Sequence, residues 1–527
     1  MATARIFLTS PLTCNRPDHD GERCAVLAHL LCCCRACLQL GGLTTLRRVY
    51  QALIGGLIVS LSSCGGTIDG ELLSLGHIEA ELRQLLSGGR GPSHDTQPTH
   101  GPTAPTQIAR SRYRRQMLER FYASRGYKPG WVGPQGALSQ ADDLLGALEA
   151  AAAQGLPPNL YRLEALRVSV TASRQGRIDD RQLARLDLSL SETFIVHADH
   201  LRRGLLDPRQ VTDHWHVPDR PSDLAGLLTT SLAFNDVAAA LERLTPRRLA
   251  YAELAGFLAT AEGDELLRLE ANLDRWRWLP RDLGDDYLLV RLAAFELDWI
   301  RGGVHQSSRR VIVGEPFRRT PSFASQITDI VVYPSWHVPA SIARDELLPR
   351  ARDDARFLRS SGFHVFRQAR PVELNRVDWR DRSQTQGLAF VQAPGGSNPL
   401  GEVKFNLKNP FAIFLHDTPS PALFGGDERD LSHGCVRVEQ AVDLARGLLA
   451  GGRGEARFES LLVAHKTGVV SLQRPLPVFF IYWTLDVVDG QLRRLTDVYG
   501  EDAQLIEAWR LATATAQTRS WNESAAP

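Results

Sequence analysis

A histidine and a cysteine in the last quarter of the chain have the residue types and spacing of a catalytic base and a nucleophile. The apolar run 411–415 leads into His416, and fifteen residues separate His416 from the segment Ser432-His433-Gly434-Cys435. A free thiol is only a few per cent thiolate at neutral pH, so a working nucleophile needs an imidazole or a helix N-terminus nearby to lower its pKa. An apolar stripe over 438–449 predicts a helix whose positive end lies near the thiol. The pattern therefore favours nucleophilic catalysis by Cys435.

Two other interpretations of these residues are open. One is a zinc site in which His416, His433 and Cys435 leave one coordination position free. The close spacing of His433 and Cys435, and the lack of an acidic base beside either histidine, disfavour this site. The other is a cysteine that only packs in the core. We expect no metal and no cofactor.

The composition points to several globular domains rather than one. The chain has 527 residues, 43% hydrophobic and 23% charged, and its 61 Lys and Arg nearly balance its 60 Asp and Glu. This balance predicts no nucleic-acid partner. Of eight cysteines, all but Cys435 lie within the first 64 residues, so a disulfide framework downstream is excluded.

The N-terminal region, 1–63, reads as an upstream extension followed by a signal peptide. Arg47 and Arg48 precede a short apolar run that ends in Leu61-Ser62-Ser63-Cys64. This ending resembles the lipobox of bacterial lipoproteins, whose cysteine is lipidated. The alternative is a plain cleaved signal with an incidental Cys64. We expect a periplasmic lipoprotein attached to a membrane through Cys64, the outer membrane being favoured over the inner because Gly65 is not acidic.

The segments that follow differ in amino-acid composition and in hydrophobic periodicity. Gly, Pro, Ser and Thr dominate much of 64–107, which predicts a flexible tether carrying the lipid anchor. Apolar residues at helical spacing over 108–273 predict an all-helical domain, with Ser139 and Asp142 starting one helix in a capping box and Gly204 ending another.

Short β-branched and aromatic runs dominate 274–490 and predict a mostly β domain. The expected strands are 287–295, 310–313, 327–333, 411–415 and 478–484. A charged helix and a Gly-rich loop within 339–408 interrupt this series, which indicates an inserted subdomain. The last residues, 491–527, are assigned to a C-terminal tail. The fold class is therefore α+β and multidomain, with a helical N-terminal part and a β part that carries an insertion.

The cysteine motif resembles the signature of a known enzyme family. His416, the fifteen residues after it and Ser432-His433-Gly434-Cys435 are similar to the active-site motif of the L,D-transpeptidases, bacterial enzymes that cross-link peptidoglycan through a cysteine. Similarity to the large multidomain members of Gram-negative envelopes covers about 111–483. In these relatives the helical region is an N-terminal scaffold, and the insertion caps the active site.

The resemblance implies a role for each residue of the motif. Cys435 corresponds to the nucleophile, His416 to the base that activates it, and the backbone carbonyl of Asp417 to the group that orients this histidine. The backbone amides of His433, Gly434 and Cys435 correspond to the oxyanion hole.

Three neighbouring positions are expected to meet the substrate. Arg437 corresponds to a basic position beside the nucleophile, which either holds a substrate carboxylate or braces the loop. Thr418 and Ser432 complete this substrate-binding set.

The reaction implied by the resemblance is acyl transfer between peptidoglycan stem peptides, which serve as donor and acceptor. The thiolate attacks the third residue of a tetrapeptide stem, expels D-alanine, and passes the acyl group to a second stem to give a 3-3 cross-link. Water as acceptor would give an L,D-carboxypeptidase, and a lipoprotein lysine would give protein anchoring. A non-catalytic envelope lipoprotein that holds peptidoglycan is the alternative from another class. Carbapenem β-lactams are the expected inhibitors.

One part of the large relatives is predicted to be missing. Many of them carry a helical peptidoglycan-binding module before the segment that corresponds to Trp276-Arg277-Trp278-Leu279-Pro280. Here only a handful of residues stand at that place. Affinity for the wall is therefore expected to come from the catalytic domain, the scaffold or the lipid anchor.

Overall fold

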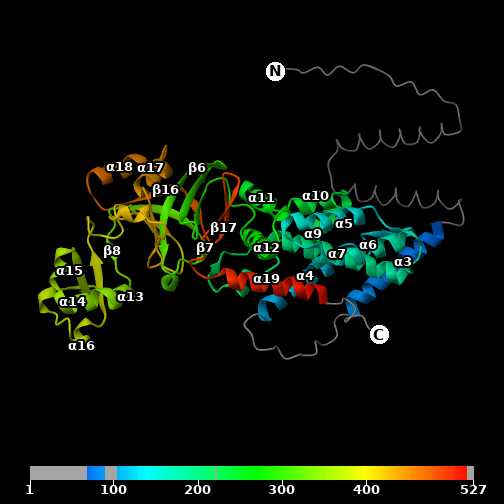
Figure 1. Cartoon of the computed structure of the whole chain (residues 1–527), viewed down its shortest axis with the longest axis horizontal. Helices are drawn as coiled ribbons and strands as arrows, with labels where there is room; N and C mark the ends of the chain where they lie inside the picture. The colour runs from blue at the N-terminus through cyan, green and yellow to red at the C-terminus, as the bar shows by residue number, and fades with distance from the viewer. Residues whose placement is uncertain (1–67, 89–103, 220–221, 519–527) are drawn as a thin grey trace, which may run out of the picture. The chain divides into compact units, whose positions relative to one another are not determined.

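The computed structural model describes residues 68–88, 104–219 and 222–518 (Figure 1). The expected signal peptide and Cys64 lie outside these residues. Within the described ranges, no helix is both long and apolar enough to cross a membrane. Helices dominate as far as α12 (Gly263–Arg277), and strands dominate after it. The expected α+β multidomain fold class is confirmed.

The helical region is built around α7 (Asp180–Arg203), whose buried residues run along its whole length. The Asp179 carboxylate accepts from the Gln182 amide at 2.7 Å while the Gln182 side chain accepts from the Asp179 amide at 3.0 Å, which is a complete capping box. The helix ends at Gly204, as predicted. The helices around α7 are α3 (Ile68–Gly88), α4 (Ala104–Ser124), α5 (Gln140–Ala150), α6 (Leu163–Arg174), α8 (Pro208–Val211), α9 (Leu224–Ala233), α10 (Val237–Glu242) and α11 (Leu249–Gly256).

Two details of the helical region differ from the sequence prediction. Helix α5 begins beside Ser139, but the Ser139 side chain makes no cap hydrogen bond, because this residue already has helical backbone angles. The segment 64–107 is not a tether throughout, since it contains α3. Ile78 and Leu82 are one turn apart on α3 and both are fully buried, so this helix packs through an apolar stripe.

The β domain is a mixed sheet in which the strand order is β12-β13-β15-β6-β5-β4-β16-β7-β3. Because β12 also pairs with β7, the hydrogen-bonded ladder closes on itself. The strands are β3 (Trp215–His216), β4 (Tyr287–Arg291), β5 (Glu296–Arg301), β6 (Val304–Gly314), β7 (Ser322–Val332), β12 (Val403–Leu407), β13 (Leu415–His416), β15 (Val436–Val438) and β16 (Gly468–Ile481), with β14 (Asp430–Ser432) paired to β6. A core of aliphatic and aromatic residues fills the inside of this sheet, and a few strand residues on its other side, such as Leu289 and Phe479, pack with the helical region.

The predicted strand 411–415 is mostly a turn. The Asn409 side chain accepts from the amides of Phe411 at 3.0 Å and Ile413 at 3.1 Å, so these groups are not available to a ladder. Ala412 has a φ of +54°, which no strand tolerates. Only Leu415 and His416 remain extended, and they form β13.

The insertion has its own sheet and core. Strands β8 (Trp336–His337), β9 (Phe363–Arg367), β10 (Arg370–Val372) and β11 (Leu388–Gln392) form a separate four-stranded sheet (Figure 1). A chain of helical turns, from α13 (Ala340–Ile342) through a π-helical turn (Ala343–Leu347) to α14 (Leu348–Asp354) and α15 (Arg356–Ser360), packs on it around Phe357, Leu358 and Phe390. The predicted insertion 339–408 is too long at its C-terminal end, because β12 belongs to the main sheet.

The residues after 490 are folded as far as the structure describes them, which differs from the expected tail. They form β18 (Gln491–Arg494), paired with β17 (Leu485–Val488), and α19 (Asp502–Thr518). Trp509 of α19 is fully buried and donates to Glu270 of α12 at 2.9 Å. The buried Arg275 donates to Asp502 at 2.7 Å. This segment therefore joins the catalytic sheet to the helical region.

Candidate active site

Three adjacent strands bring the candidate catalytic residues to one face of the sheet. His416 on β13 is in register with Lys404 on the antiparallel β12 and with Arg437 on the parallel β15. Residues in register on neighbouring strands project to the same face, and so do residues two apart on one strand. Cys435 lies two residues before Arg437, and the amide between them, that of Val436, donates to Phe414 at 2.9 Å. The thiol therefore joins the imidazole on this face.

His416 is held in the tautomer that a general base needs. Its side chain is only 4% exposed, and Nδ1 lies 2.6 Å from the backbone oxygen of Asp417. A carbonyl oxygen can only accept, so Nδ1 carries the proton and Nε2 of the neutral ring is left as the acceptor. Burial lowers the pKa of His416 to about 4, and the nearby charges of Arg437 and Lys404 act in the same direction. The imidazole is thus neutral at neutral pH.

The carbonyl that orients His416 is itself fixed by a close backbone approach. The Asp417 carboxylate accepts from the Glu402 amide at 2.9 Å, and the Asp417 amide donates to Val403. Gly401 has a φ of +61°, and a Cβ there would lie 2.3 Å from the Asp417 carboxylate. Glycine at 401 therefore permits the position of Asp417, and through it that of His416.

Cys435 is half-buried and forms no disulfide bond with any residue that the structure describes. Its Sγ lies 3.7 Å from the Ala412 oxygen. Burial raises the pKa of the Cys435 thiol, and the positive charges of Lys404 and Arg437 oppose this rise. The expected helix does not start directly after the thiol, since β15 lies between Cys435 and α17 (Ala441–Leu449) along the chain. The resting pair is thus a neutral thiol beside a neutral imidazole.

The loop that carries Cys435 is braced by hydroxyl groups. The buried Ser432 hydroxyl donates to the Cys435 carbonyl at 2.5 Å and accepts from the Gly434 amide at 3.1 Å. Thr320 donates to the Gly434 carbonyl at 2.8 Å, and Gly434 has a φ of +105°. Within the described part of the chain, the amides of His433 and Cys435 have no such partner. Two of the three predicted oxyanion-hole amides are therefore open to a ligand, and that of Gly434 is occupied.

Ser432 and Thr418 are placed as parts of the framework. The Ser432 hydroxyl is used within the loop, as described above. Thr418 is 8% exposed, and its hydroxyl accepts from the Ser420 amide at 3.3 Å, which fixes the turn after His416. Neither of these predicted substrate-binding hydroxyls is directed to open solvent in this state.

Lys404 is a site residue that the sequence analysis missed. Its Nζ lies 3.6 Å from the centre of the Phe414 ring, and burial lowers its pKa while Cys435 raises it. Arg437 on β15 is a second cation beside the thiol. Its pKa is lowered by burial and raised by Cys435, as is that of Lys404. Strand β12 alternates buried apolar residues with the half-buried Lys404 and Asn406, so nothing in the local sequence distinguishes Lys404 from an ordinary outward-facing residue. The two cations create a positive field around the thiol, which suits a substrate carboxylate.

His433 points away from the thiol and His416, toward the insertion. Its Nε2 donates to the Glu346 carboxylate, which lies in the π-helical turn. Among the described residues, no group of three His, Cys, Asp or Glu side chains is arranged to hold a metal ion.

Comparison with known proteins agrees with this arrangement. Residues 116–258 match the family described as a scaffold domain, and residues 285–455 match the L,D-transpeptidase catalytic domain, which contains both His416 and Cys435. A Haemophilus influenzae protein named "Putative L,D-transpeptidase" is 28% identical over 397 residues, which are 74% of this chain and 78% of that protein. The chain therefore carries a scaffold domain followed by an L,D-transpeptidase catalytic domain.

Proposed function

We propose that this protein forms 3-3 cross-links in peptidoglycan through an acyl-enzyme on Cys435. The observation that carries the proposal is the common face of β12, β13 and β15, where the thiol, the imidazole of His416 and two cations meet inside an L,D-transpeptidase catalytic domain. A domain of this family implies peptidoglycan stem peptides as substrates. The donor in this proposal is a tetrapeptide stem.

The first half-reaction follows from the protonation states of the pair. Nε2 of His416 takes the proton as Sγ of Cys435 attacks the carbonyl carbon of the third stem residue. The amides of His433 and Cys435 donate to the oxyanion that develops. The C–N bond to D-alanine then breaks, the amine leaves with the proton from His416, and a thioester remains.

The second half-reaction regenerates the enzyme. A side-chain amine of a second stem attacks the thioester carbon, His416 accepts a proton from that amine, and the thiol is released when the proton returns to sulfur. Lys404 and Arg437 hold carboxylates of the stems, because both cations lie beside the thiol and neither forms an ion pair within the described residues.

The test is to incubate the purified protein with a disaccharide-tetrapeptide and identify the products by mass spectrometry. We expect a 3-3 linked dimer, free D-alanine and a covalent adduct on Cys435. Cys435→Ala should abolish all three, as well as acylation by carbapenems, and His416→Ala should slow turnover by about 10²- to 10⁴-fold. Cross-linking by Cys435→Ala would overturn the proposal.

The products of this experiment also show which acceptor takes the acyl group from Cys435. A tripeptide without dimer would identify water as the acceptor, and an adduct formed only with a lysine-containing lipoprotein would identify protein anchoring. Binding without any release of D-alanine would favour a non-catalytic role in holding peptidoglycan.

The cellular site is part of the proposal. Because the apolar run ends in Leu61-Ser62-Ser63-Cys64, we infer a mature protein that begins at a lipidated Cys64 and partitions with the outer membrane. Mass spectrometry of the mature N-terminus and membrane fractionation test this. A soluble protein with an unmodified N-terminus would contradict it.

A further inference from the structure

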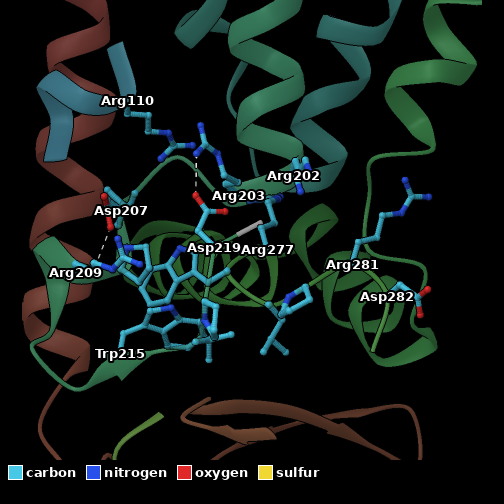
Figure 2. A pocket seen from close by; sticks show the side chains of 17 residues that line it. Arg110, Arg202, Arg203, Asp207, Arg209, Trp215, Asp219, Arg277, Arg281 and Asp282 are labelled. Carbon is cyan, nitrogen blue, oxygen red and sulfur yellow. Dashed lines mark hydrogen bonds and ion pairs between the residues drawn. The ribbon is translucent and has the colours of Figure 1, made fainter. Parts of the chain in front are cut away.

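An arginine-rich cavity of about 310 Å³ lies where the helical region meets the start of the catalytic domain (Figure 2). It is bounded by α4, the end of α7, α8, β3 and the segment that follows α12, which includes the Trp-Arg-Trp-Leu-Pro stretch singled out in the sequence. The charged and aromatic side chains that line it are Arg110, Arg202, Arg203, Arg209, Arg277, Arg281, Asp207, Asp219, Asp282, Trp215 and Trp278. Six arginines against three aspartates give the lining an excess of positive charge.

Buried Asp199 fixes one wall of this cavity. Its carboxylate accepts from Nε of Arg110 at 2.7 Å, from Nε of Arg114 at 2.7 Å and from Nε of Arg203 at 2.6 Å. One carboxylate thus holds three guanidinium groups. This leaves a local excess of positive charge in a fixed geometry.

Buried Asp274 fixes a second set of groups at this cavity. It accepts from the amides of Leu205 at 2.7 Å and Leu206 at 3.0 Å, and from Arg277 at 3.2 Å. Nε1 of Trp278 also donates to it, at 3.3 Å. The guanidinium of Arg277 and the ring of Trp278 are therefore pre-organised before any ligand arrives.

The three aspartates that line the cavity already have partners. Asp207 accepts from the Arg209 amide at 3.1 Å, Asp219 from Arg203 at 2.9 Å, and Asp282 from the Gly284 amide at 2.8 Å. Figure 2 shows Asp219 directed at Arg203. These carboxylates neutralise the lining only in part.

Donors remain available for a ligand. The guanidinium groups of Arg209 and Arg281 are exposed, and neither has a hydrogen-bond or ion-pair partner in the described ranges. Nε of Arg277 is buried and also lacks a partner there. The pKa of Arg281 is lowered by burial and then by Arg247, Arg243 and Arg202, as expected where like charges crowd together.

The cavity also has an aromatic side. The rings of Trp215 and Trp278 meet edge to face with their centres 5.4 Å apart, and Figure 2 shows Arg209 beside Trp215. Small-molecule sites combine such an apolar wall with a few fixed polar groups. The volume is near the lower end of the usual range, so the cavity encloses only one part of a larger ligand and the remainder stays outside it.

We propose that this cavity binds a carboxylate-bearing unit of peptidoglycan, a sugar with its stem peptide, as a second contact apart from Cys435. The arginines pair with stem carboxylates, and the two tryptophans pack against the sugar. The inference rests on the proposed function for the identity of the ligand. It would provide an attachment to the wall close to the segment before Trp276, where the sequence analysis expects the separate binding module of the large relatives to be missing.

The experiment measures binding in a protein that cannot turn over. Cys435→Ala protein labelled with 5-fluorotryptophan is titrated with a disaccharide-tetrapeptide, and the ¹⁹F resonances of Trp215 and Trp278 are assigned by substitution with Phe. We expect both resonances to shift on binding. The double variant Arg209→Glu/Arg281→Glu should lose these shifts and weaken binding at this site at least tenfold. Arg177→Glu/Arg185→Glu is the matched control, since both residues are exposed on the helical region and do not line the cavity.

Further arms identify the ligand. The same muropeptide with amidated carboxylates should leave the resonances unchanged, and so should inorganic phosphate. Shifts with phosphate but not with the muropeptide would overturn the assignment to peptidoglycan. If the charge reversal perturbs folding, as judged by circular dichroism, Arg209→Gln/Arg281→Gln replaces it. Unshifted Trp215 and Trp278 resonances in the parent protein, or equal loss in the control variant, would overturn the site.

The catalytic proposal is tested separately in the active protein. Arg209→Glu/Arg281→Glu with Cys435 intact should still form the thioester on soluble muropeptide at the parent rate. If the muropeptide shifts the Trp215 and Trp278 resonances but the active protein forms no cross-links, the binding-site proposal stands and the catalytic proposal fails. If the active protein forms cross-links but the Trp215 and Trp278 resonances do not shift, the catalytic proposal stands and the binding-site proposal fails.

Discussion

His433 and Glu346 join the insertion to the loop that carries Cys435. Nε2 of His433 donates to Oε1 of Glu346 at 2.5 Å, and Arg318 donates to the same oxygen at 3.2 Å. Glu346 lies in the insertion, whereas His433 is two residues before the thiol. Movement of the insertion relative to the loop that carries Cys435 therefore requires this contact to break.

The first prediction concerns this contact. Glu346→Ala removes the shared acceptor, so amides of the insertion, 336–392, should exchange with deuterium faster, while those of β13 and β15 should not. Glu373→Ala, a change of an exposed glutamate elsewhere in the insertion, should leave the exchange as it is. Unchanged exchange in Glu346→Ala would show that the contact does not hold the insertion in place.

The second prediction concerns Lys404, whose positive charge lowers the pKa of the Cys435 thiol against the larger effect of burial. Lys404→Met should raise that pKa further, so the pH profile of alkylation by iodoacetamide should move to higher pH and the rate at pH 8 should fall. Lys408→Met, which removes an exposed lysine on the same stretch of chain, is the control. A profile in the parent protein that titrates below the pKa of a free thiol would contradict the effect of burial at Cys435.

The third prediction uses the buried imidazole of His416. Its pKa is lowered to about 4 in the folded protein, whereas an unfolded histidine titrates near 6.5. Between these values the unfolded chain binds more protons, so stability is fully present above about pH 6.5 and is lost as the pH falls toward 4. The loss is on the order of 3 kcal/mol.

His416→Gln should lack this contribution. Urea unfolding at pH 7 and at pH 4 should therefore show a smaller decrease in the variant than in the parent protein. Other buried histidines, such as His197 and His200, are present in both proteins, so their contributions cancel in the comparison. Equal decreases would show that His416 is not held neutral.

The fourth prediction concerns Gly401, the residue that permits the position of Asp417. A methyl group there would meet the Asp417 carboxylate on a backbone with positive φ, so Gly401→Ala should cost about 1–3 kcal/mol of unfolding free energy. Displacement of the Asp417 carbonyl should also slow acylation of Cys435, on the order of 100-fold. Gly396→Ala, where a Cβ meets nothing within 4 Å and φ is not positive, should change neither quantity. A normal rate of Cys435 acylation in Gly401→Ala would show that the position of the Asp417 carbonyl does not control the orientation of His416.

The fifth prediction concerns the C-terminal helix α19. Arg275 is buried and pairs with Asp502 at 2.7 Å, so Asp502→Ala leaves it only the longer ion pair with Glu501 at 4.0 Å and should destabilise the protein by about 3 kcal/mol in thermal or urea unfolding. Glu507→Ala, at an exposed position of the same helix, should stay within about 0.5 kcal/mol of the parent. A small effect of Asp502→Ala would show that helix α19 contributes little to the stability of the folded protein.

The sequence alone was enough to predict the fold class and the central pair of the candidate site. Helical periodicity over 108–273 and β-branched runs after 274 depend on local patterns, and the structure has helices and strands in these regions. His416 and Cys435 are recognisable because their chemistry requires particular residue types at a particular spacing. The match of 285–455 to the L,D-transpeptidase catalytic domain contains both.

Only the tertiary structure decided what surrounds this pair. Lys404 and Glu346 reach the site from β12 and the insertion, and no local pattern marks either as a partner of Cys435 or His433. The direction in which the pKa of the Cys435 thiol shifts depends on its burial by distant segments, whereas the sequence argument considered only the nearby helix end. Likewise, α19 looked like a tail because Arg275 and Asp502 are 227 positions apart in the chain. The burial of a side chain, the electrostatic field around it and its long-range partners all depend on residues that are near in space, and residues near in space need not be near in the sequence.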